Sequence, residues 1–310
     1  SALRSRLDPS LELLADVLLE PAFPAAEFDR QLKLQLAAIE RESSEPSSMA
    51  SRVLPRLVYG DGHAYASPLT GSGTRASVSS LRREDAERWY RAWFRPGNAV
   101  LVVVGDTTPA EIVPRLERLL AAWKPGEAPR KSVAAVGRPP RERVFLVDRP
   151  GAAQSVILAG EAAPPRANPE EIAQGVVNWI LGGQFTSRIN MNLREDKHWS
   201  YGAGTHLLDA RGPRLFFAFA PVQADKTREA VVELQKELRA IRGDRPPTPD
   251  ELAAAKGSLT LALPGRWETA AAVGASISEV VTLGLGDRYY DGYSARVREL
   301  TPAQAARASR

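Results

Sequence analysis

One order of amphipathic helices occurs twice along this chain of 310 residues, over residues 9–94 and again over residues 226–310. Each stretch reads as a helix, a proline-containing loop, an acidic helix start, two helices, a turn and a helix capped by Ser or Thr. Residues 24–27 match 248–251 and residues 81–84 match 300–303, in both cases about 220 positions apart. The recurrence predicts two similar halves, each longer than half of this chain. The first half would then lack its opening strands and helix, and the second its closing strand.

Apolar spacing and β-branched runs predict the individual elements. Helices are expected at residues 9–21, 25–41, 47–59, 80–94, 109–123, 169–181, 187–195, 226–241, 249–263 and 270–283, with a last one starting at 301. Strands are expected at residues 99–105, 143–147, 154–160, 200–208 and 214–221. This mixture predicts an α+β fold.

A stretch rich in proline separates the two predicted halves. Residues 124–141 hold four prolines, two glycines and five basic residues without a periodic apolar pattern, which is typical of a linker. We therefore expect the C-terminal part of a first domain at residues 1–123 and a second domain at residues 142–310.

Composition excludes several classes of function. The chain has no cysteine, which excludes disulfides, thiolate zinc sites, iron–sulfur clusters and a cysteine nucleophile. Lys and Arg (41) exceed Asp and Glu (37) by four, with no long run of like charge, so no nucleic-acid partner is indicated. No apolar stretch is long enough to span a membrane, and the first residues do not resemble an export signal.

The motifs of common hydrolases are absent from the sequence. The three histidines are His63, His198 and His206, and neither H-E-x-x-H nor H-x-x-E-H occurs. There is also no G-x-S-x-G and no phosphate-binding glycine motif. We therefore predict no catalytic residue in this chain.

Two neighbouring segments stand out, L-G-G-Q-F-T-S-R at residues 181–188 and L-R-E-D-K-H-W-S-Y-G at residues 193–202. Arg194 and Tyr201 lie seven positions apart, where a helix ends and a strand begins. Such a turn can aim a guanidinium group and a phenol hydroxyl at one peptide carbonyl. The alternative is that Arg194 covers a helix end and Tyr201 packs within a strand.

These two segments, together with three further ones, resemble the M16 metallopeptidases of the insulinase, pitrilysin and mitochondrial processing peptidase type. The further segments are F-D-R-Q…I-E-R at residues 28–41, Y-G-D-G-H-x-Y followed by L-T-G-S at 59–72, and R-P-G-N-A-V-L-V-V-V-G-D at 95–106. The resemblance covers nearly the whole chain in order. It implies pairs of similar halves, each an antiparallel sheet packed with helices.

The resemblance also implies a zinc ion held by an H-x-x-E-H helix and a downstream glutamate. Aligned on residues 28–30, the family pattern puts Ala38 at the glutamate ligand and Gln31 at a supporting acidic position. An alanine methyl cannot bind zinc, and a neutral amide cannot supply negative charge. A shift of one turn would offer Glu42 instead. We therefore expect no metal ligand in this chain, with Glu42 as the alternative.

The family's substrate-binding residues match Arg194 and Tyr201. The resemblance thus predicts a non-catalytic periplasmic subunit that binds peptide or unfolded polypeptide and lends Arg194 and Tyr201 to a zinc-bearing M16 partner. The zinc belongs to the partner, and the peptide would add as a strand to a sheet edge. Two alternatives stay open: a fragment of an active zinc peptidase, and an assembly subunit without a peptide substrate.

Overall fold

A computed structural model describes residues 1–137, 139 and 141–310, and it shows an α+β fold. Its one sheet is antiparallel and has three strands in the order β1-β3-β2. The strands are β1 (Gln154–Ala163), β2 (Gly204–Leu208) and β3 (Arg214–Gln223). β1 pairs with β3 from Gln154↔Gln223 to Ala163↔Arg214, and β2 pairs with β3 from Gly204↔Phe219 to Leu208↔Leu215.

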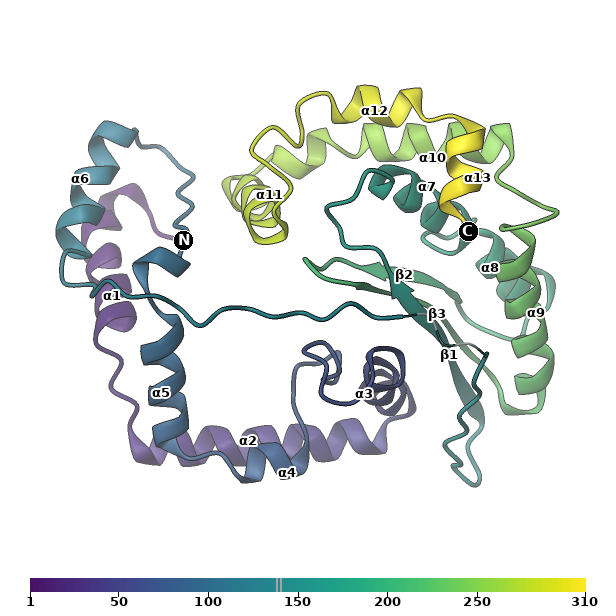
Figure 1. The fold of residues 1–310 in the computed structure, drawn as a ribbon, viewed down its shortest axis with the longest axis horizontal. Coiled ribbons are helices and arrows are strands. Elements are labelled where there is room, and N and C mark those ends of the chain that lie inside the picture. Colours follow the sequence, from purple (N-terminus) through teal and green to yellow (C-terminus); the bar gives the residue numbers. More distant parts are fainter. Residues whose placement is uncertain (138, 140) are drawn as a thin grey trace. The chain divides into compact units, whose positions relative to one another are not determined.

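The central strand β3 is apolar along almost its whole length because both of its faces are covered. Leu215 and Phe217 pack with Leu54 of α3 (Pro46–Tyr59) on one face. Ala218 and Ala220 point to the other face, into the main hydrophobic core. Figure 1 shows α3 below the sheet, α7 above it, and α8 and α9 on its right-hand side. Alternation with a period of two therefore sets which core each residue joins.

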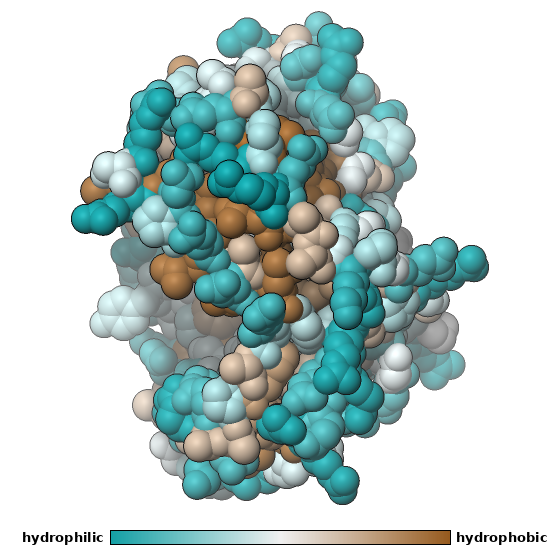
Figure 2. All heavy atoms as spheres, turned by 90° about the vertical axis from the view of Figure 1, so that its left-hand side faces the viewer, coloured by the Kyte–Doolittle hydropathy of each residue, from teal (hydrophilic) through white to brown (hydrophobic). Residues whose placement is uncertain are grey.

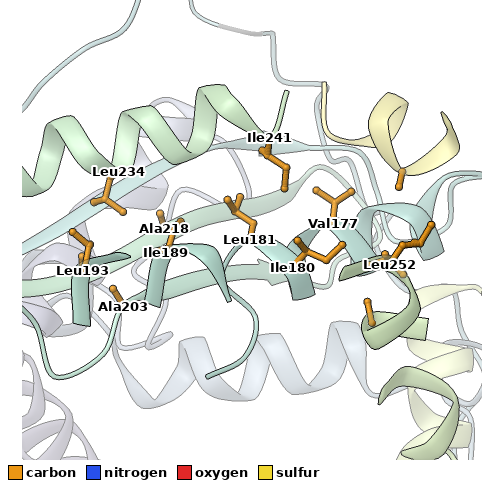
Figure 3. Packing of buried hydrophobic residues seen from close by; sticks show 14 of the residues in the cluster. Val177, Ile180, Leu181, Ile189, Leu193, Ala203, Ala218, Leu234, Ile241 and Leu252 are labelled. Atoms are coloured by element: carbon orange, nitrogen blue, oxygen red, sulfur yellow. The ribbon is translucent and has the colours of Figure 1, made fainter. Parts of the chain in front are cut away.

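The main core lies between the sheet and the helices α7 (Glu171–Leu181), α8 (Arg188–Asn190) and α9 (Thr227–Ala240). Figure 3 shows its aliphatic side chains pointing toward one another from these elements. The helices α10 (Pro249–Leu261) and α13 (Pro302–Ala308) also contribute buried side chains to this core. Further helical elements in this part of the chain are η3 (Met191–Asp196), η4 (Ala224–Lys226), η5 (Pro264–Trp267) and α12 (Tyr293–Glu299).

The chain divides into two compact units whose segments alternate along the sequence. Unit 1 comprises Ser1–Glu40, Gly73–Ser132 and Arg266–Ser278, and unit 2 comprises Arg41–Ser72, Val133–Gly265 and Glu279–Arg310. The sheet and both hydrophobic clusters belong to unit 2. The elements wholly or partly in unit 1 are η1 (Arg4–Arg6), α1 (Leu7–Leu19), α2 (Ala25–Ser44), α4 (Arg75–Ser79), α5 (Arg83–Trp93), η2 (Pro96–Asn98), α6 (Pro109–Leu119) and α11 (Ala270–Leu283).

Unit 1 buries few apolar side chains. Among the described residues, its buried apolar side chains are Ala15, Ile39, Val78 and Ile112. Several larger ones are exposed instead, among them Leu13 and Val17 of α1 and Val100, Leu101 and Val103. Figure 2 looks onto the side that carries α1 and α6 and shows an apolar area framed by hydrophilic side chains.

Two predicted strands are wrong. Residues 99–105 and 143–147 form no strand, and most of their side chains are exposed. A β-branched run becomes a strand only where another strand takes up its hydrogen bonds, and no described residue pairs with these segments. The expected sheet of the first half is therefore not formed by the described residues. The strand expected at 200–208 is shorter, because residues 200–203 make a turn.

The predicted linker, residues 124–141, includes positions 138 and 140, which lie outside the described residues. The boundaries drawn around it stay a prediction. None of the helices among the described residues is long and apolar enough to cross a membrane.

Candidate functional site

Arg194 and Tyr201 lie in the connection between α8 and the edge strand β2, which is called the turn below. Arg194 belongs to η3, and Tyr201 lies between η3 and β2. α8 continues directly into η3, a π-helical turn, where Lys197 N–H donates to Asn192 O at 3.0 Å. His198 then takes a left-handed backbone conformation with φ of 58°, and its N–H donates to Arg194 O at 3.2 Å. π-Helical turns are rare and occur frequently at functional sites.

Arg194 presents donors that its own protein does not use. Its side chain is 38% exposed, and its Nε lies 3.3 Å from Glu195 Oε1. Its guanidinium carbon lies 4.6 Å from the ring centroid of Phe185. No described residue accepts a hydrogen bond from either Nη group. The guanidinium can therefore donate to a carbonyl or carboxylate that approaches from solvent.

Tyr201 is 88% exposed, so the alternative that it packs within a strand is wrong. The backbone around it is nevertheless tied down. Ser200 Oγ donates to Gly202 O at 3.0 Å, and Ala203 N–H donates to Asn190 Oδ1 at 3.1 Å. A fixed backbone with an exposed phenol is an arrangement suited to binding a ligand.

The glycine pair at 182–183 brings the end of α7 against β2. Thr205 N–H donates to Gly182 O at 3.0 Å. A Cβ on Gly182 would lie 2.3 Å from Thr205 N, and one on Gly204 would lie 2.4 Å from Gly182 O. Only glycines permit this approach. This hydrogen bond also uses the N–H of Thr205 at the edge of β2, so an added strand cannot bond to that N–H.

Arg188, the last residue of the segment 181–188, has a structural role. It is buried, and its Nε and Nη2 each donate to a different carboxylate oxygen of Glu251 at 2.6 Å. Nη2 also donates to Pro246 O at 3.0 Å. Burial acts to raise the pKa of Glu251, but the hydrogen bonds from Arg188 and Thr248 outweigh it and keep that pKa below its ordinary value. Arg188 thus joins α8 to the start of α10.

Two surface cavities border the turn. One, of about 400 Å³, is lined mainly by charged side chains that pair with one another, such as Glu237 with Arg245 and Glu233 with Lys236. The other, of about 450 Å³, lies between the turn and α9 and is lined by Trp199 together with residues of α9.

The residues at the predicted zinc positions do not fit a zinc ion. Ala38 has no donor atom, and Gln31 Nε2 donates to Glu27 Oε1 at 2.8 Å. The Glu42 carboxylate is ion-paired with Arg52 and also accepts hydrogen bonds from Ser72 Oγ at 2.6 Å and Thr70 Oγ1 at 3.2 Å.

Burial acts to raise the pKa of Glu42, but the hydrogen bonds from Ser72, Arg52 and Thr70 hold it below its ordinary value. Glu42 is therefore a satisfied structural carboxylate in this structure. Within the described part of the chain, no group of three or more His, Cys, Asp or Glu side chains is placed to hold a metal.

Sequence reasoning missed Phe185 and Asn190, which contact Arg194 and the residues after Tyr201. Asn190 lies next to the fully buried Ile189, and its own side chain is buried. A polar residue among the apolar positions of a short helix was the available signal, because a buried amide requires partners.

Comparisons with known proteins agree with one another. The sequence model described as the peptidase M16 inactive domain matches residues 80–259. An uncharacterized zinc protease of Mycobacterium leprae is 24% identical over 264 residues, which is 83% of this chain and 57% of that protein. This chain thus spans little more than half the length of that relative.

Two solved structures share the fold. The peptidase M16 inactive domain from Pseudomonas fluorescens superposes with a TM-score of 0.89 at 22% identity, over 98% of this chain and 71% of that one. A protease from Helicobacter pylori superposes with a TM-score of 0.87 at 16% identity, over 99% of this chain and 74% of that one.

Proposed function

Because this chain belongs to the peptidase M16 family, we propose that it is a non-catalytic subunit that binds peptide and completes a heterodimeric zinc peptidase. In this proposal Arg194 and Tyr201 hold the substrate in the active site of a zinc-bearing partner subunit. One observation carries it: Tyr201 is exposed and Arg194 partly exposed beside a tied-down backbone, and the family resemblance places an alanine, Ala38, at the zinc-ligand position.

The chemistry of the pair suits a peptide backbone. A guanidinium donates two parallel N–H bonds to carbonyl or carboxylate oxygens, and a phenol hydroxyl can donate or accept. Bonds to backbone atoms give affinity with little dependence on sequence, as expected for a subunit that binds unfolded polypeptide. Because Gly182 already occupies the Thr205 N–H, a peptide added to the edge of β2 would have to pair beyond Thr205.

The test uses the full-length product of this gene, reconstituted with the zinc-bearing M16 subunit of the same organism. Replacing Arg194 and Tyr201 together by alanine should lower turnover of fluorescein-labelled, carboxymethylated casein by roughly a hundredfold, the scale of losing a preorganised donor to the reacting group. Arg118→Ala, at an exposed arginine of α6, is the matched control and should leave turnover unchanged.

Gel filtration must show that the pair still assembles. Unchanged turnover in the double variant would overturn the proposal and favour the assembly-subunit alternative.

The name zinc protease carried by the Mycobacterium leprae relative favours a second candidate, an active zinc peptidase. Elemental analysis of the full-length product, purified without its partner, separates the two. We expect a zinc content near zero. About one zinc per chain, removed by a chelator together with peptidase activity, would favour the second candidate and make Glu42 or another acid its ligand.

The proposal has two further parts, the location of the protein and its division into two similar halves. By resemblance to zinc-less bacterial subunits of this type, we propose a periplasmic location. The order of helices α1 to α5 is matched by that of α9 to α13, which supports two similar halves.

A further inference from the structure

We propose that Phe185 and Asn190 are positioning residues for the peptide-binding pair. Phe185 holds the guanidinium of Arg194, and Asn190 ties the turn that carries Phe185 to the residues that follow Tyr201. The inference rests on the proposed function, because it concerns residues that act through Arg194 and Tyr201.

The ring of Phe185 lies under the guanidinium of Arg194. The guanidinium carbon is 4.6 Å from the ring centroid, well within the range of a cation–π contact. Phe185 is 56% exposed, so packing in the core does not account for its place. Because the other charged partner of the Arg194 side chain among the described residues is the exposed Glu195, the ring limits the rotamers that the long arginine side chain can adopt.

The turn that carries Phe185 is itself held rigidly. Gln184 Oε1 accepts hydrogen bonds from Thr186 N–H and Thr186 Oγ1, both at 2.8 Å. On the other side of Phe185, its carbonyl oxygen accepts a hydrogen bond from Asn190 Nδ2 at 2.6 Å. The ring therefore rests on a backbone that is fixed before any ligand arrives.

Asn190 uses both ends of its amide. Nδ2 reaches back to Phe185 O, while Oδ1 accepts the N–H of Ala203, two residues after Tyr201. The side chain is 4% exposed, so neither bond is replaced by water. A short side chain that carries a donor and an acceptor at one branch point is a property of asparagine. Asn190 thus joins the support of Arg194 to the support of Tyr201.

The test is a double-mutant cycle in the reconstituted pair, with kcat/KM for labelled, carboxymethylated casein as the readout. Phe185→Leu keeps an apolar side chain but removes the ring and should lower kcat/KM by roughly two- to fivefold, the size of an exposed cation–π contact. Phe185→Tyr keeps the ring and should restore the wild-type value. In the Arg194→Ala background, Phe185→Leu should have no further effect.

The matched control is Phe145→Leu. Phe145 is 53% exposed and also lies under an arginine, Arg143, at 5.5 Å, but it is remote in sequence from the pair. This variant should leave kcat/KM unchanged.

Asn190→Leu should lower the melting temperature in every background, because it leaves Phe185 O and Ala203 N–H without their partner. It should lower kcat/KM where Arg194 or Tyr201 is present and have no further effect where both are replaced by alanine. That dependence separates positioning from a merely structural role.

The outcomes distinguish the inference from the function beneath it. If Arg194→Ala leaves kcat/KM unchanged, the proposed function falls and the inference with it. If Arg194→Ala lowers kcat/KM but Phe185→Leu acts equally in both backgrounds, the function stands and the inference is overturned.

Discussion

Arg188 and Arg194 are six residues apart in two neighbouring segments, and their surroundings differ. Arg188 is buried and donates hydrogen bonds to Glu251 and to backbone carbonyls. Arg194 is partly exposed and keeps both Nη groups available to a ligand. The residue type is the same, so burial and partners decide that Arg188 stabilises the fold and that Arg194 has donors free for the peptide binding that we propose.

Gly182 lies where the end of α7 approaches the backbone of β2. Gly182→Ala should destabilise the protein by about 3 kcal/mol, because the new Cβ would meet the backbone of β2 at 2.3 Å. Gly175→Ala lies within α7, the helix that Gly182 follows, where a Cβ meets nothing within 4 Å, and should stabilise the protein by about 0.5–1 kcal/mol. Urea denaturation of both variants checks the contrast. Equal effects would show that α7 does not approach β2 so closely.

Among the elements, α8 and α10 are joined by the ion pair between Arg188 and Glu251. Arg188→Met should cost about 2 kcal/mol at pH 7, because it leaves the partly buried carboxylate of Glu251, whose side chain is 30% exposed, without the charged hydrogen bonds from its partner. Arg30→Met is the matched control, since Arg30 pairs with Glu27 on the exposed surface of α2 and its loss should have no measurable effect.

The same ion pair predicts a pH dependence. The pKa of Glu251 is lower in the folded than in the unfolded protein, so its stabilisation is present above the ordinary glutamate pKa of about 4.5 and is lost as pH falls through the folded value. The difference in unfolding free energy between wild type and Arg188→Met should therefore shrink below about pH 4.5. A difference that stays constant down to pH 3 would contradict this assignment.

Over the whole molecule, the two units differ in how much apolar surface they bury. Unit 2 contains the sheet and its two hydrophobic clusters, whereas the buried apolar side chains described in unit 1 are few. Because burial of apolar surface is the main source of stability, unit 1 should open at lower free energy. Hydrogen exchange followed by mass spectrometry at increasing urea should show amides of α1 and α6 exchanging before those of α7 and β3. Simultaneous exchange would mean that the two units unfold as one.

Residues 99–105 and 143–147 should exchange fastest of all, because no described strand takes up their hydrogen bonds. Protection of these amides in the same experiment would show that they pair with a strand in solution.

The sequence alone predicted most helices and the strands β1 and β3, and it indicated Arg194 and Tyr201 as a candidate pair. These features are local: helical spacing, a β-branched run and a motif are visible within a few neighbouring residues. The match of residues 80–259 to the peptidase M16 inactive domain agrees with the family inferred from those motifs.

Only the tertiary structure decided which apolar runs become strands, which arginine is buried, and that Phe185 contacts Arg194 while Asn190 bonds to Phe185 and Ala203. The first two depend on a partner distant in sequence, and the third depends on turns that bring residues 5 to 13 positions apart into contact. A strand forms only beside another strand. Arg188 has a structural role because the fold brings Glu251, 63 residues away in sequence, within hydrogen-bond distance. Sequence periodicity describes a segment's own preferences, whereas pairing across the chain is set by how the whole chain packs.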